Sequence, residues 1–466
     1  MTEQLTAHPD TAAVVLAAGR GTRFRSATSK VLHHAAGRSL LGHVLGSLAP
    51  LGLGRIVVVV APDADDVVAE VAAWDARMEL PVTTVVQPEP RGTGDALDVA
   101  MRALPDDVAR VLVVPGDTPL LLPETLAALL AVDPAVALGV MVLELGDPFG
   151  YGRIVRDAGG AVAGIVEERD ATDEQRRIRE VNAGMYVCDR AAVQPLVSAL
   201  GTQNAQGERY LTDVVGAVIG SGGRTEAVLA PADEVAGVND RAQLARAAAV
   251  LRGRHLDRLM LAGVSVIDPA HTYVDVDVDV GAETVLLPGT ILEGATSVGE
   301  GATIGPATHL TDCTVGDDAV VHSTRADGAR IGARVQVGPF AHLRPGTCLE
   351  ADARVGAFVQ TKNATVGEGA KLPHLSYVGD ADVGAGANVA CGVVTVNYDG
   401  REKHRTVIGD GAFVGCGTML VAPVTVGDGA FVGAGSTITD DVPADALAIA
   451  RARQVTKEGR ARGRLG

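Results

Sequence analysis

A glycine-containing loop follows the first apolar run of the chain and carries basic residues. It reads Leu16-Ala-Ala-Gly-Arg-Gly-Thr-Arg23, and Lys30 follows seven residues later. Glycine lets backbone N–H groups approach phosphate oxygens, and Arg23 and Lys30 would neutralise their charge. The loop is neither a Walker A sequence nor the GxGxxG fingerprint, because Arg and Lys replace the third glycine. The combination predicts a triphosphate or sugar-phosphate site, and a plain tight turn is the alternative.

Asp117 ends a later apolar run, in the sequence Pro-Gly-Asp. A carboxylate at the carboxyl edge of a parallel sheet can hold Mg²⁺. The alternative interpretation is that the side chain of a single Asp or Asn caps a helix or a turn. Further polar and glycine residues follow in order along this half of the chain: Gln87, Gly92, Thr93, Gly152, Glu167, Asn182 and Asn239.

The elements that must position these residues alternate between strand and helix. Apolar runs predict strands at 14–18, 56–60, 82–86, 111–114 and 137–143, and helical spacing predicts helices at 40–48, 64–74 and 93–104. The alternation predicts an α/β domain with a parallel sheet covered on both faces, which binds ligands at the carboxyl ends of its strands. An Ala/Leu/Arg-rich segment, 239–262, predicts a linker helix.

A period of six residues dominates the rest of the chain. Apolar residues recur at 280, 286, 292, 298, 304 and 310, at 331, 337, 343, 349 and 355, and at 408, 414, 420, 426, 432 and 438. Three hexads per coil predict a triangular parallel β-helix with a column of Val, Ile and Leu as its core. The stretch 357–403 is less regular, and its segment VNYDGREKHR predicts an inserted loop on a binding face.

Composition and charge restrict the class of protein. The 466 residues suit two or three domains, and 40 Lys and Arg against 57 Asp and Glu give a formal charge of −17, which disfavours nucleic-acid binding. The five cysteines form no CxxC pair, which fits a reducing compartment rather than a disulfide or zinc framework. We expect a cytoplasmic protein, because the polar start resembles no signal peptide and no apolar run is long enough for a membrane span.

Together these motifs resemble one family, the bacterial bifunctional UDP-N-acetylglucosamine pyrophosphorylase / glucosamine-1-phosphate N-acetyltransferase. The resemblance covers about 12–455 and follows the family's order. It implies a Rossmann-like nucleotidyltransferase domain over 1–238, a linker helix over 239–262 and a left-handed parallel β-helix with acetyltransferase function over 263–466. It also implies a homotrimer, and a role in supplying peptidoglycan and lipopolysaccharide precursors.

In the first half, the resemblance implies uridylyl transfer from UTP to N-acetylglucosamine-1-phosphate with release of pyrophosphate. Asp117 and Asn239 match the family's Mg²⁺ ligands. The positions implied to contact UTP or the nucleotide-sugar product are Leu16, Ala17, Ala18, Gly19, Arg23, Lys30, Gln87, Gly92, Thr93, Gly152, Glu167, Asn182 and Asn239. No protein nucleophile is needed, because the attacking phosphate is already an anion.

In the second half, the resemblance implies acetyl transfer from acetyl-CoA, as co-substrate, to glucosamine-1-phosphate. His374 matches the general base, which would take a proton from the attacking amine. Arg344 and Lys362 would grip the sugar phosphate. The other positions implied to contact substrate or acetyl-CoA are Tyr377, Asn388, Cys391, Asn397, Tyr398, Lys403, Cys416, Ala434 and Arg451.

Two other functions were weighed against this one. A monofunctional pyrophosphorylase with an assembling β-helix would not need His374, Tyr377 and the NYDG segment, and a non-enzymatic scaffold would not need the loop 16–23. The chain also departs from the family's usual pattern: Ser29 replaces Pro and Asp95 replaces His. Asn182-Ala183-Gly184 is present where the family usually has Asn-Thr-Gly. Cys391 and Cys416 occupy positions where Ala or Ser is typical, and they are either coenzyme contacts or packing residues.

Overall fold

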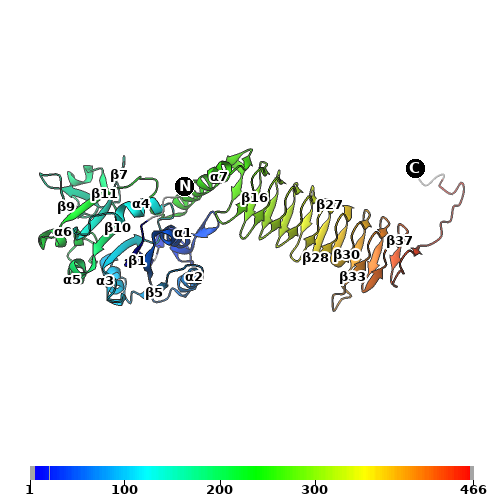
Figure 1. Cartoon of the computed structure of the whole chain (residues 1–466), viewed down its shortest axis with the longest axis horizontal. Coiled ribbons are helices and arrows are strands. Elements are labelled where there is room, and N and C mark those ends of the chain that lie inside the picture. The colour runs from blue at the N-terminus through cyan, green and yellow to red at the C-terminus, as the bar shows by residue number, and fades with distance from the viewer. Residues whose placement is uncertain (1–5, 20, 462–466) are drawn as a thin grey trace. The chain divides into compact units, whose positions relative to one another are not determined.

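The computed structural model describes residues 6–19 and 21–461 and divides the chain into two compact units, Met1–Leu251 and Arg252–Gly466. The division falls inside helix α7 (Arg241–Leu261), which corresponds to the helix expected over 239–262. Figure 1 labels the elements of both units. Each unit has a hydrophobic core of its own, so the two are described separately.

The first unit is built on one large mixed sheet with the strand order β11-β7-β10-β6-β1-β4-β5, and a hairpin of β8 and β9 pairs with β10. The strands are β1 (His8–Leu16), β4 (Leu53–Val60), β5 (Val82–Val86), β6 (Arg110–Pro115), β7 (Leu138–Glu144), β8 (Arg153–Arg156), β9 (Val162–Val166), β10 (Glu180–Asp189) and β11 (Thr225–Leu229), with a small separate pair, β2 (His34–Ala35) and β3 (Arg38–Ser39).

Alternate residues of the central strands face opposite sides of the sheet, and helices cover both sides (Figure 1). Ala13 and Val15 pack with α1 and α2, whereas Ala12 and Val14 pack with α3, α5 and α6. The helices are α1 (Leu40–Leu48), α2 (Asp65–Asp75), α3 (Thr93–Ala103), α4 (Pro123–Leu130), α5 (Arg190–Ser198) and α6 (Asp213–Gly220), with short 3₁₀ turns η1 (Thr22–Phe24), η2 (Lys30–Leu32), η3 (Ala49–Leu51) and η4 (Gln175–Arg177).

The strands and helices expected from the apolar pattern are present, but the sheet is not wholly parallel. Strand β10 runs antiparallel to β6 and β7. The apolar pattern could not reveal this direction, because a central strand is buried on both faces whichever way it runs.

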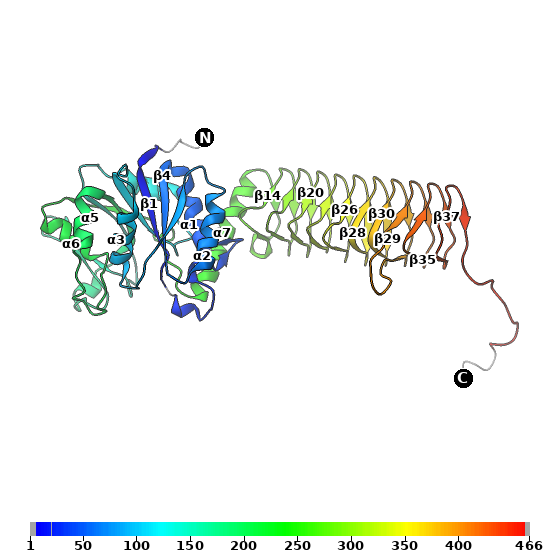
Figure 2. The same ribbon diagram turned by 90° about the horizontal axis from the view of Figure 1, so that it is seen from below.

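The second unit is a parallel β-helix, whose stacked coils are visible in Figure 2. One face is a ladder of β12 (Ser265–Val266), β15 (Val285–Leu286), β18 (Thr303–Ile304), β21 (Val320–Val321), β24 (Gln336–Val337), β27 (Arg354–Ala357), β29 (Lys371–His374), β31 (Asn388–Val389), β34 (Phe413–Val414), β37 (Phe431–Val432) and β39 (Leu447–Ala448).

The remaining strands form the rest of the coils. They are β13 (Tyr273–Val274), β14 (Asp279–Val280), β16 (Ile291–Glu293), β17 (Ser297–Val298), β19 (His309–Thr311), β20 (Thr314–Val315), β22 (Arg325–Asp327), β23 (Arg330–Ile331), β25 (His342–Leu343), β26 (Cys348–Leu349), β28 (Gln360–Val366), β30 (Tyr377–Val383), β32 (Val394–Val396), β33 (Thr406–Ile408), β35 (Met419–Val421), β36 (Val424–Val426) and β38 (Thr437–Ile438); a 3₁₀ turn, η5 (Pro269–His271), lies near the start.

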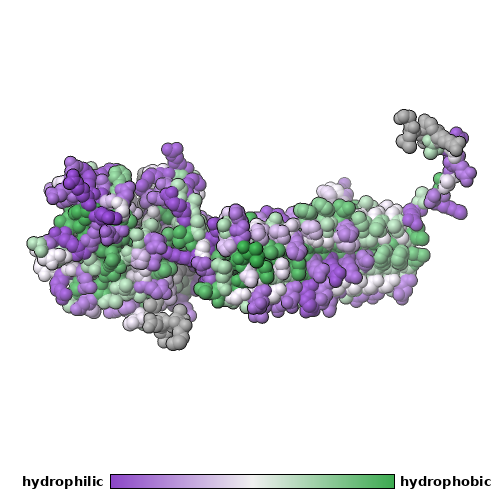
Figure 3. Space-filling model, turned by 90° about the horizontal axis from the view of Figure 1, so that it is seen from above, coloured by the Kyte–Doolittle hydropathy of each residue, from purple (hydrophilic) through white to green (hydrophobic). Residues whose placement is uncertain are grey.

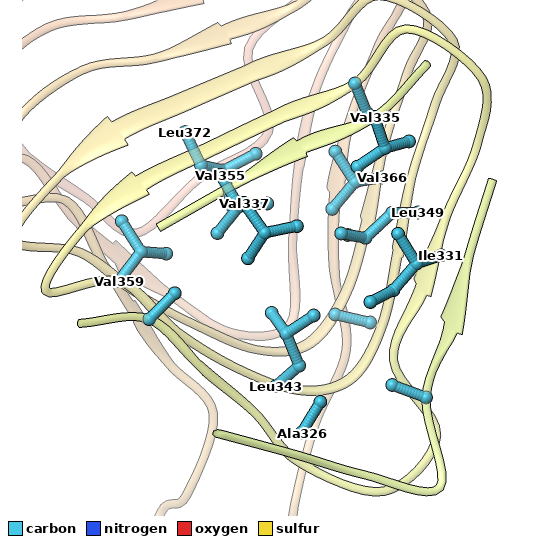
Figure 4. Close-up of a cluster of buried hydrophobic side chains, with 14 of the residues drawn as sticks. Ala326, Ile331, Val335, Val337, Leu343, Leu349, Val355, Val359, Val366 and Leu372 are labelled. Atoms are coloured by element: carbon cyan, nitrogen blue, oxygen red, sulfur yellow. The ribbon is translucent and has the colours of Figure 1, made fainter. Parts of the chain in front are cut away.

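The hexad residues form the core of this unit. Every apolar position of the three six-residue series is buried, and Figure 4 shows how side chains such as Ile331, Leu349 and Val366 fill the space inside the coils. Residues 18 apart stack in register, as Leu286 does on Ile304, so three hexads complete one coil. The expected β-helix of hexapeptide repeats is therefore confirmed, and the last turns of α7 cover one end of its core with Leu256 and Leu259.

The irregular stretch distorts the stacking locally. The in-register spacing rises to 25 residues where Asn388 pairs with Phe413, because the segment 397–405 leaves the coil between β32 and β33. That segment is closed by a bridge between Tyr398 and Lys403. The inserted loop expected from the sequence is present.

Candidate active sites

In the first unit, three strands end at the same edge of the sheet and open a cleft of about 560 Å³. Leu16 of β1 is in register with Val59 of β4 and Pro115 of β6, so the loops after β1 and β6 start side by side. The lining residues are Leu16, Ala17, Ala18, Gly19, Lys30, Val31, Gln87, Pro90, Gly92, Thr93, Ala96, Pro115, Asp117, Glu167, Asn182, Gly184, Tyr186, Glu208, Leu211 and Thr212.

Most candidate residues of this half therefore line one cleft. The exceptions are Arg23, Gly152 and Asn239, which do not line it. Gly152 lies just behind it, since its carbonyl accepts a hydrogen bond of 2.9 Å from the N–H of Asn182. Arg23 is exposed and reaches Asn239, whose Oδ1 accepts from its guanidinium at 2.8 Å.

Two of the cations and the two expected metal ligands form one cluster. The Lys30 ammonium makes a short ion pair with Asp117 Oδ2 and lies 3.4 Å from Asn239 Oδ1. A backbone bond of 2.9 Å from Val238 N–H to the Asp117 carbonyl fixes the two loops together. Gly21, whose φ is +54°, allows the loop to pass Lys30, because a Cβ there would lie 2.5 Å from the Lys30 Cβ.

The oxygens of Asp117 and Asn239 fit a Mg²⁺ site that substrate phosphates would complete. The Lys30 ammonium touches both oxygens, so a positive charge already lies between them. Magnesium in nucleotide enzymes is held by one or two protein oxygens together with phosphates. In the described part of the chain no group of three or more His, Cys, Asp or Glu side chains is arranged to hold a metal ion.

Polar side chains at the far side of the cleft hold one another in place. The Thr212 hydroxyl donates to Glu167 Oε1 at 2.9 Å, and the Asn182 amide donates to the Tyr186 hydroxyl at 2.8 Å. Burial raises the pKa of Glu167, and the hydrogen bond from Thr212 partly opposes this shift. The arrangement places a carboxylate and a side-chain amide in the lining of one cleft.

Two residues that no sequence motif marked, Arg209 and Thr212, support this cleft. Gln87 donates to the Gly92 carbonyl at 3.1 Å and to Asp95 at 3.0 Å, and Asp95 is paired with Arg209 at 3.0 Å. Gly92 has φ +106°, and a Cβ there would lie 2.6 Å from the Arg209 carbonyl oxygen. Arg209 and Thr212 belong to a segment without any phosphate or metal motif, so no sequence signal marked them.

In the second unit, three cations gather on one side of the coils. Arg344 follows β25, Lys362 lies in β28, and Lys403 lies in the inserted loop. The register of β25 on β28 places Arg344 and Lys362 in successive coils, one above the other. A hydrogen bond with Lys403 and its charge lower the pKa of Lys362, and Arg344 adds to this effect. Like charges held this close favour an anionic ligand such as a sugar phosphate.

A buried carboxylate, Asp380, lies beneath this cluster and was not expected from the sequence. Asn363 donates to Asp380 Oδ1 at 2.7 Å and Asn397 donates to Oδ2 at 2.5 Å. Burial raises the pKa of Asp380, but these hydrogen bonds and the charges of Lys362 and Lys403 outweigh it, so the net pKa is lowered. Asn397 also lies 3.4 Å from the Tyr377 hydroxyl. The NYDG segment is thus tied to the coils.

A second column runs along the ladder of β29, β31, β34 and β37. Its register puts His374, Cys391, Cys416 and Ala434 in successive coils. His374 is exposed, and no described residue hydrogen-bonds its ring. Further along, Arg451 donates to the Ala434 carbonyl at 2.6 Å. The residues expected to act on the acetyl group therefore share one face.

Asn388 and Tyr398 complete the set of candidates in this unit. The side-chain oxygen of Asn388 is buried without a hydrogen-bond partner among the described residues. Tyr398 is 56% exposed at the start of the inserted loop. Across both units, no helix within the described ranges has the length and hydropathy that a membrane crossing requires.

Comparisons with known proteins agree with this division. Residues 13–183 match the family model of the MobA-like NTP transferase domain, and 405–440 match that of the bacterial transferase hexapeptide (six repeats). The chain is 48% identical to the bifunctional protein GlmU of Trichlorobacter lovleyi, 50% to that of Mycolicibacterium gilvum and 49% to that of Streptomyces avermitilis. The matches cover 96%, 97% and 96% of this chain and 97%, 91% and 93% of those relatives. The chain belongs to the GlmU family of bifunctional transferases, the family that its motifs resemble.

Proposed function

We propose that the enzyme makes UDP-N-acetylglucosamine in two separate sites. The coil face of the second unit would transfer an acetyl group from acetyl-CoA to glucosamine-1-phosphate, and the cleft of the first unit would then join the product to UMP from UTP. The observation that supports this most directly is that one chain contains two different sites. In the first unit, the loop 16–19 lies beside Asp117 and Asn239. In the second unit, a face that carries His374 lies beside the cations Arg344, Lys362 and Lys403.

In the cleft, the loop 16–19 and Lys30 would bind the triphosphate, while Glu167 and Asn182 would orient the sugar. The sugar phosphate attacks the α-phosphorus of UTP and pyrophosphate leaves. Asp117 and Asn239 would hold Mg²⁺, which supplies charge neutralisation on the phosphates when bound. Lys30 would exchange its contact with Asp117 for phosphate oxygens, so its charge stays in the site as the substrate enters.

On the coil face, Arg344, Lys362 and Lys403 would hold the phosphate of glucosamine-1-phosphate. His374 would take a proton from the sugar's ammonium or amine, and the nitrogen would attack the thioester carbonyl of acetyl-CoA. Exposure of the His374 ring leaves room for this role. Asp380 touches neither reacting atom in this scheme; it is a positioning residue that holds Asn363 and Asn397.

The acetyl site is proposed to lie between chains of a homotrimer. Three apolar side chains are exposed at one corner of successive coils: Phe340 (61%), Phe358 (58%) and Leu375 (60%), and the two Phe rings stack at 5.3 Å. Figure 3 shows apolar side chains gathered in patches on the surface of this unit. An exposed apolar stripe beside a polar site favours a closed symmetric contact. A stable monomer in sedimentation that still transfers acetyl groups would contradict the trimer.

Two assays on the full-length protein test the bifunctional proposal. Acetyl transfer is followed by release of the CoA thiol from acetyl-CoA with glucosamine-1-phosphate. Uridylyl transfer is followed by pyrophosphate release from UTP with N-acetylglucosamine-1-phosphate and Mg²⁺. Both activities are expected; uridylyl transfer alone would favour the monofunctional pyrophosphorylase. With both present, the product would supply cell-wall precursors, and a cytoplasmic location is proposed because all five cysteines are free thiols.

A further inference from the structure

Two cysteines lie one above the other on the coil face. The register of β31 on β34 pairs Asn388 with Phe413, and three residues later it aligns Cys391 with Cys416. The alignment continues beyond the strands, because the Gly417 N–H donates to the Cys391 carbonyl at 2.8 Å. Neighbouring strands lie about 4.8 Å apart, and side chains in register point the same way. The two thiols are therefore neighbours on one face, about one strand spacing apart.

This pair differs from the other cysteines. Cys188 and Cys313 are buried, whereas Cys416 is exposed and Cys391 is half-buried. Cys348 is also partly accessible, but it already hydrogen-bonds with Arg330 at 2.6 Å and Glu350 at 3.1 Å. Cys391 and Cys416 are thus the two accessible thiols that the described residues place side by side.

The spacing favours a bridging ion over a disulfide. A disulfide needs Cβ atoms about 3.8 Å apart, which is about 1 Å less than the strand spacing, so the coils would have to move together. A metal–thiolate bond is about 2.3 Å long, so two thiolates on opposite sides of one ion lie about 4.6 Å apart. This separation matches the strand spacing with little movement of the backbone.

The ligand set also indicates which ion. Zinc in proteins takes four ligands, and no group of three or more His, Cys, Asp or Glu side chains suited to a metal is present among the described residues. Thiolates select soft ions. We propose that Cys391 and Cys416 form a two-coordinate site for a soft, thiophilic monovalent ion such as Cu(I) or Ag(I). On binding, each thiol releases one proton to solvent and each sulfur forms one bond to the ion.

The site would inhibit acetyl transfer, a consequence that rests on the proposed function of this face. The register of β29 on β31 places His374 in the coil next to Cys391, and the Gly392 N–H donates to the His374 carbonyl at 3.3 Å. An ion held by Cys391 would lie one strand spacing from the proposed base and in the path of the acetyl group. The cleft of the first unit contains no part of this column, so uridylyl transfer would continue.

Silver(I), which is redox-inert here, is the probe, used on the full-length protein in chloride-free and thiol-free buffer. Equilibrium dialysis with elemental analysis is expected to find one tightly bound ion that is lost in C391S/C416S and kept in the control C348S. Each single variant, C391S or C416S, should bind at least about 100-fold more weakly, because the chelate advantage of the second thiolate is lost. Circular dichroism and uridylyl transfer check that the variants fold.

Three outcomes would overturn the metal site: tight binding retained in C391S/C416S, equal binding in both single variants and wild type, or conversion of the pair to a disulfide on mild oxidation without any ion bound. Initial rates of radiolabelled acetyl transfer, before the CoA product accumulates and competes for silver, test the consequence. Each rate is expressed relative to the silver-free rate of the same protein, and inhibition on this scale in wild type and C348S but not in C416S supports it. One ion bound with acetyl transfer unchanged would instead contradict the placement of the acetyl site on this column, while the metal site would stand.

Discussion

The two candidate sites organise charge in opposite ways. In the cleft of the first unit, the Lys30 ammonium is already paired with Asp117, and both side chains are largely shielded, with 14% and 18% of their surfaces exposed. On the coil face of the second unit, Lys362 lies beside another cation, Lys403, and the repulsion lowers its pKa. The first arrangement pairs one cation with one carboxylate, whereas in the second the single carboxylate Asp380 faces more than one cation, so an anionic ligand would balance the remaining charge.

This difference suggests different requirements for binding. In the cleft, an incoming phosphate and metal must replace an existing ion pair, so binding is an exchange of partners. On the coil face, an incoming phosphate relieves repulsion and raises the pKa of Lys362, so binding should be accompanied by uptake of protons at high pH. The cleft is also enclosed by one chain, whereas the coil face is open and is proposed to be completed by neighbouring chains.

The largest effect is expected from Asp117→Ala. It removes the carboxylate that pairs with Lys30 and would hold the metal, so uridylyl transfer should fall by about 10³-fold or more. Acetyl transfer should stay near wild type, because no residue is shared between the sites. Pyrophosphate release and CoA release, measured on the same preparation, check this. Asn239→Ala is the companion variant, and an equal loss of both activities in a folded protein would refute two independent sites.

Replacing His374 tests the other site. His374→Ala should lower kcat for acetyl transfer by about 10²–10⁴-fold, the usual contribution of a general base. KM should change less, because Arg344 and Lys362 remain to hold the phosphate. Uridylyl transfer with supplied N-acetylglucosamine-1-phosphate is the internal control. If the variant acetylates at close to the wild-type rate, the base is another group or water.

The contrast between the sites also explains what could be predicted from sequence. The hexad series predicted a column of core residues that is buried throughout, and the loop 16–23 located the cleft, because both depend on local spacing. Asp380, Arg209 and Thr212 were missed because they act through partners distant in sequence: Thr212 reaches Glu167 across 45 residues and Arg209 reaches Asp95 across 114. The antiparallel course of β10 was missed because burial on both faces hides strand direction.

A third prediction concerns the stability of the second unit. His255 on α7 is 4% exposed, and burial, together with the charge of Arg258, lowers its pKa to about 4. Unfolding restores an ordinary pKa near 6.5, so below that pH the unfolded chain binds the extra proton. The stabilisation is complete above about pH 6.5 and is lost as the pH falls to about 4, at a total cost of about 3 kcal/mol.

Denaturant unfolding of the full chain, followed by a probe in the β-helix, measures this loss at pH 7, 6, 5 and 4. His255→Gln should flatten the dependence between pH 6.5 and 4, and His374→Gln, a change at an exposed histidine of the same unit, should not. Trp74, the single tryptophan of the chain, lies in the first unit and reports the unfolding of that unit separately. A slope unchanged in His255→Gln would assign the effect to carboxylates instead.

The smallest effect is expected from Thr212→Val at the sugar end of the cleft. The substitution preserves shape but removes the hydroxyl that donates to Glu167 at 2.9 Å, and a hydrogen bond to a carboxylate contributes about 1.5–3 kcal/mol. That bond opposes the burial that raises the pKa of Glu167, so its loss should raise this pKa further. If the carboxylate form binds the sugar, the acid limb of kcat/KM for uridylyl transfer moves to higher pH. On the plateau above this limb, KM for the sugar phosphate should rise only about threefold to tenfold. Thr212→Ser, which keeps the hydroxyl, should restore the wild-type profile, whereas a merely structural role for Thr212 would lower activity equally at every pH.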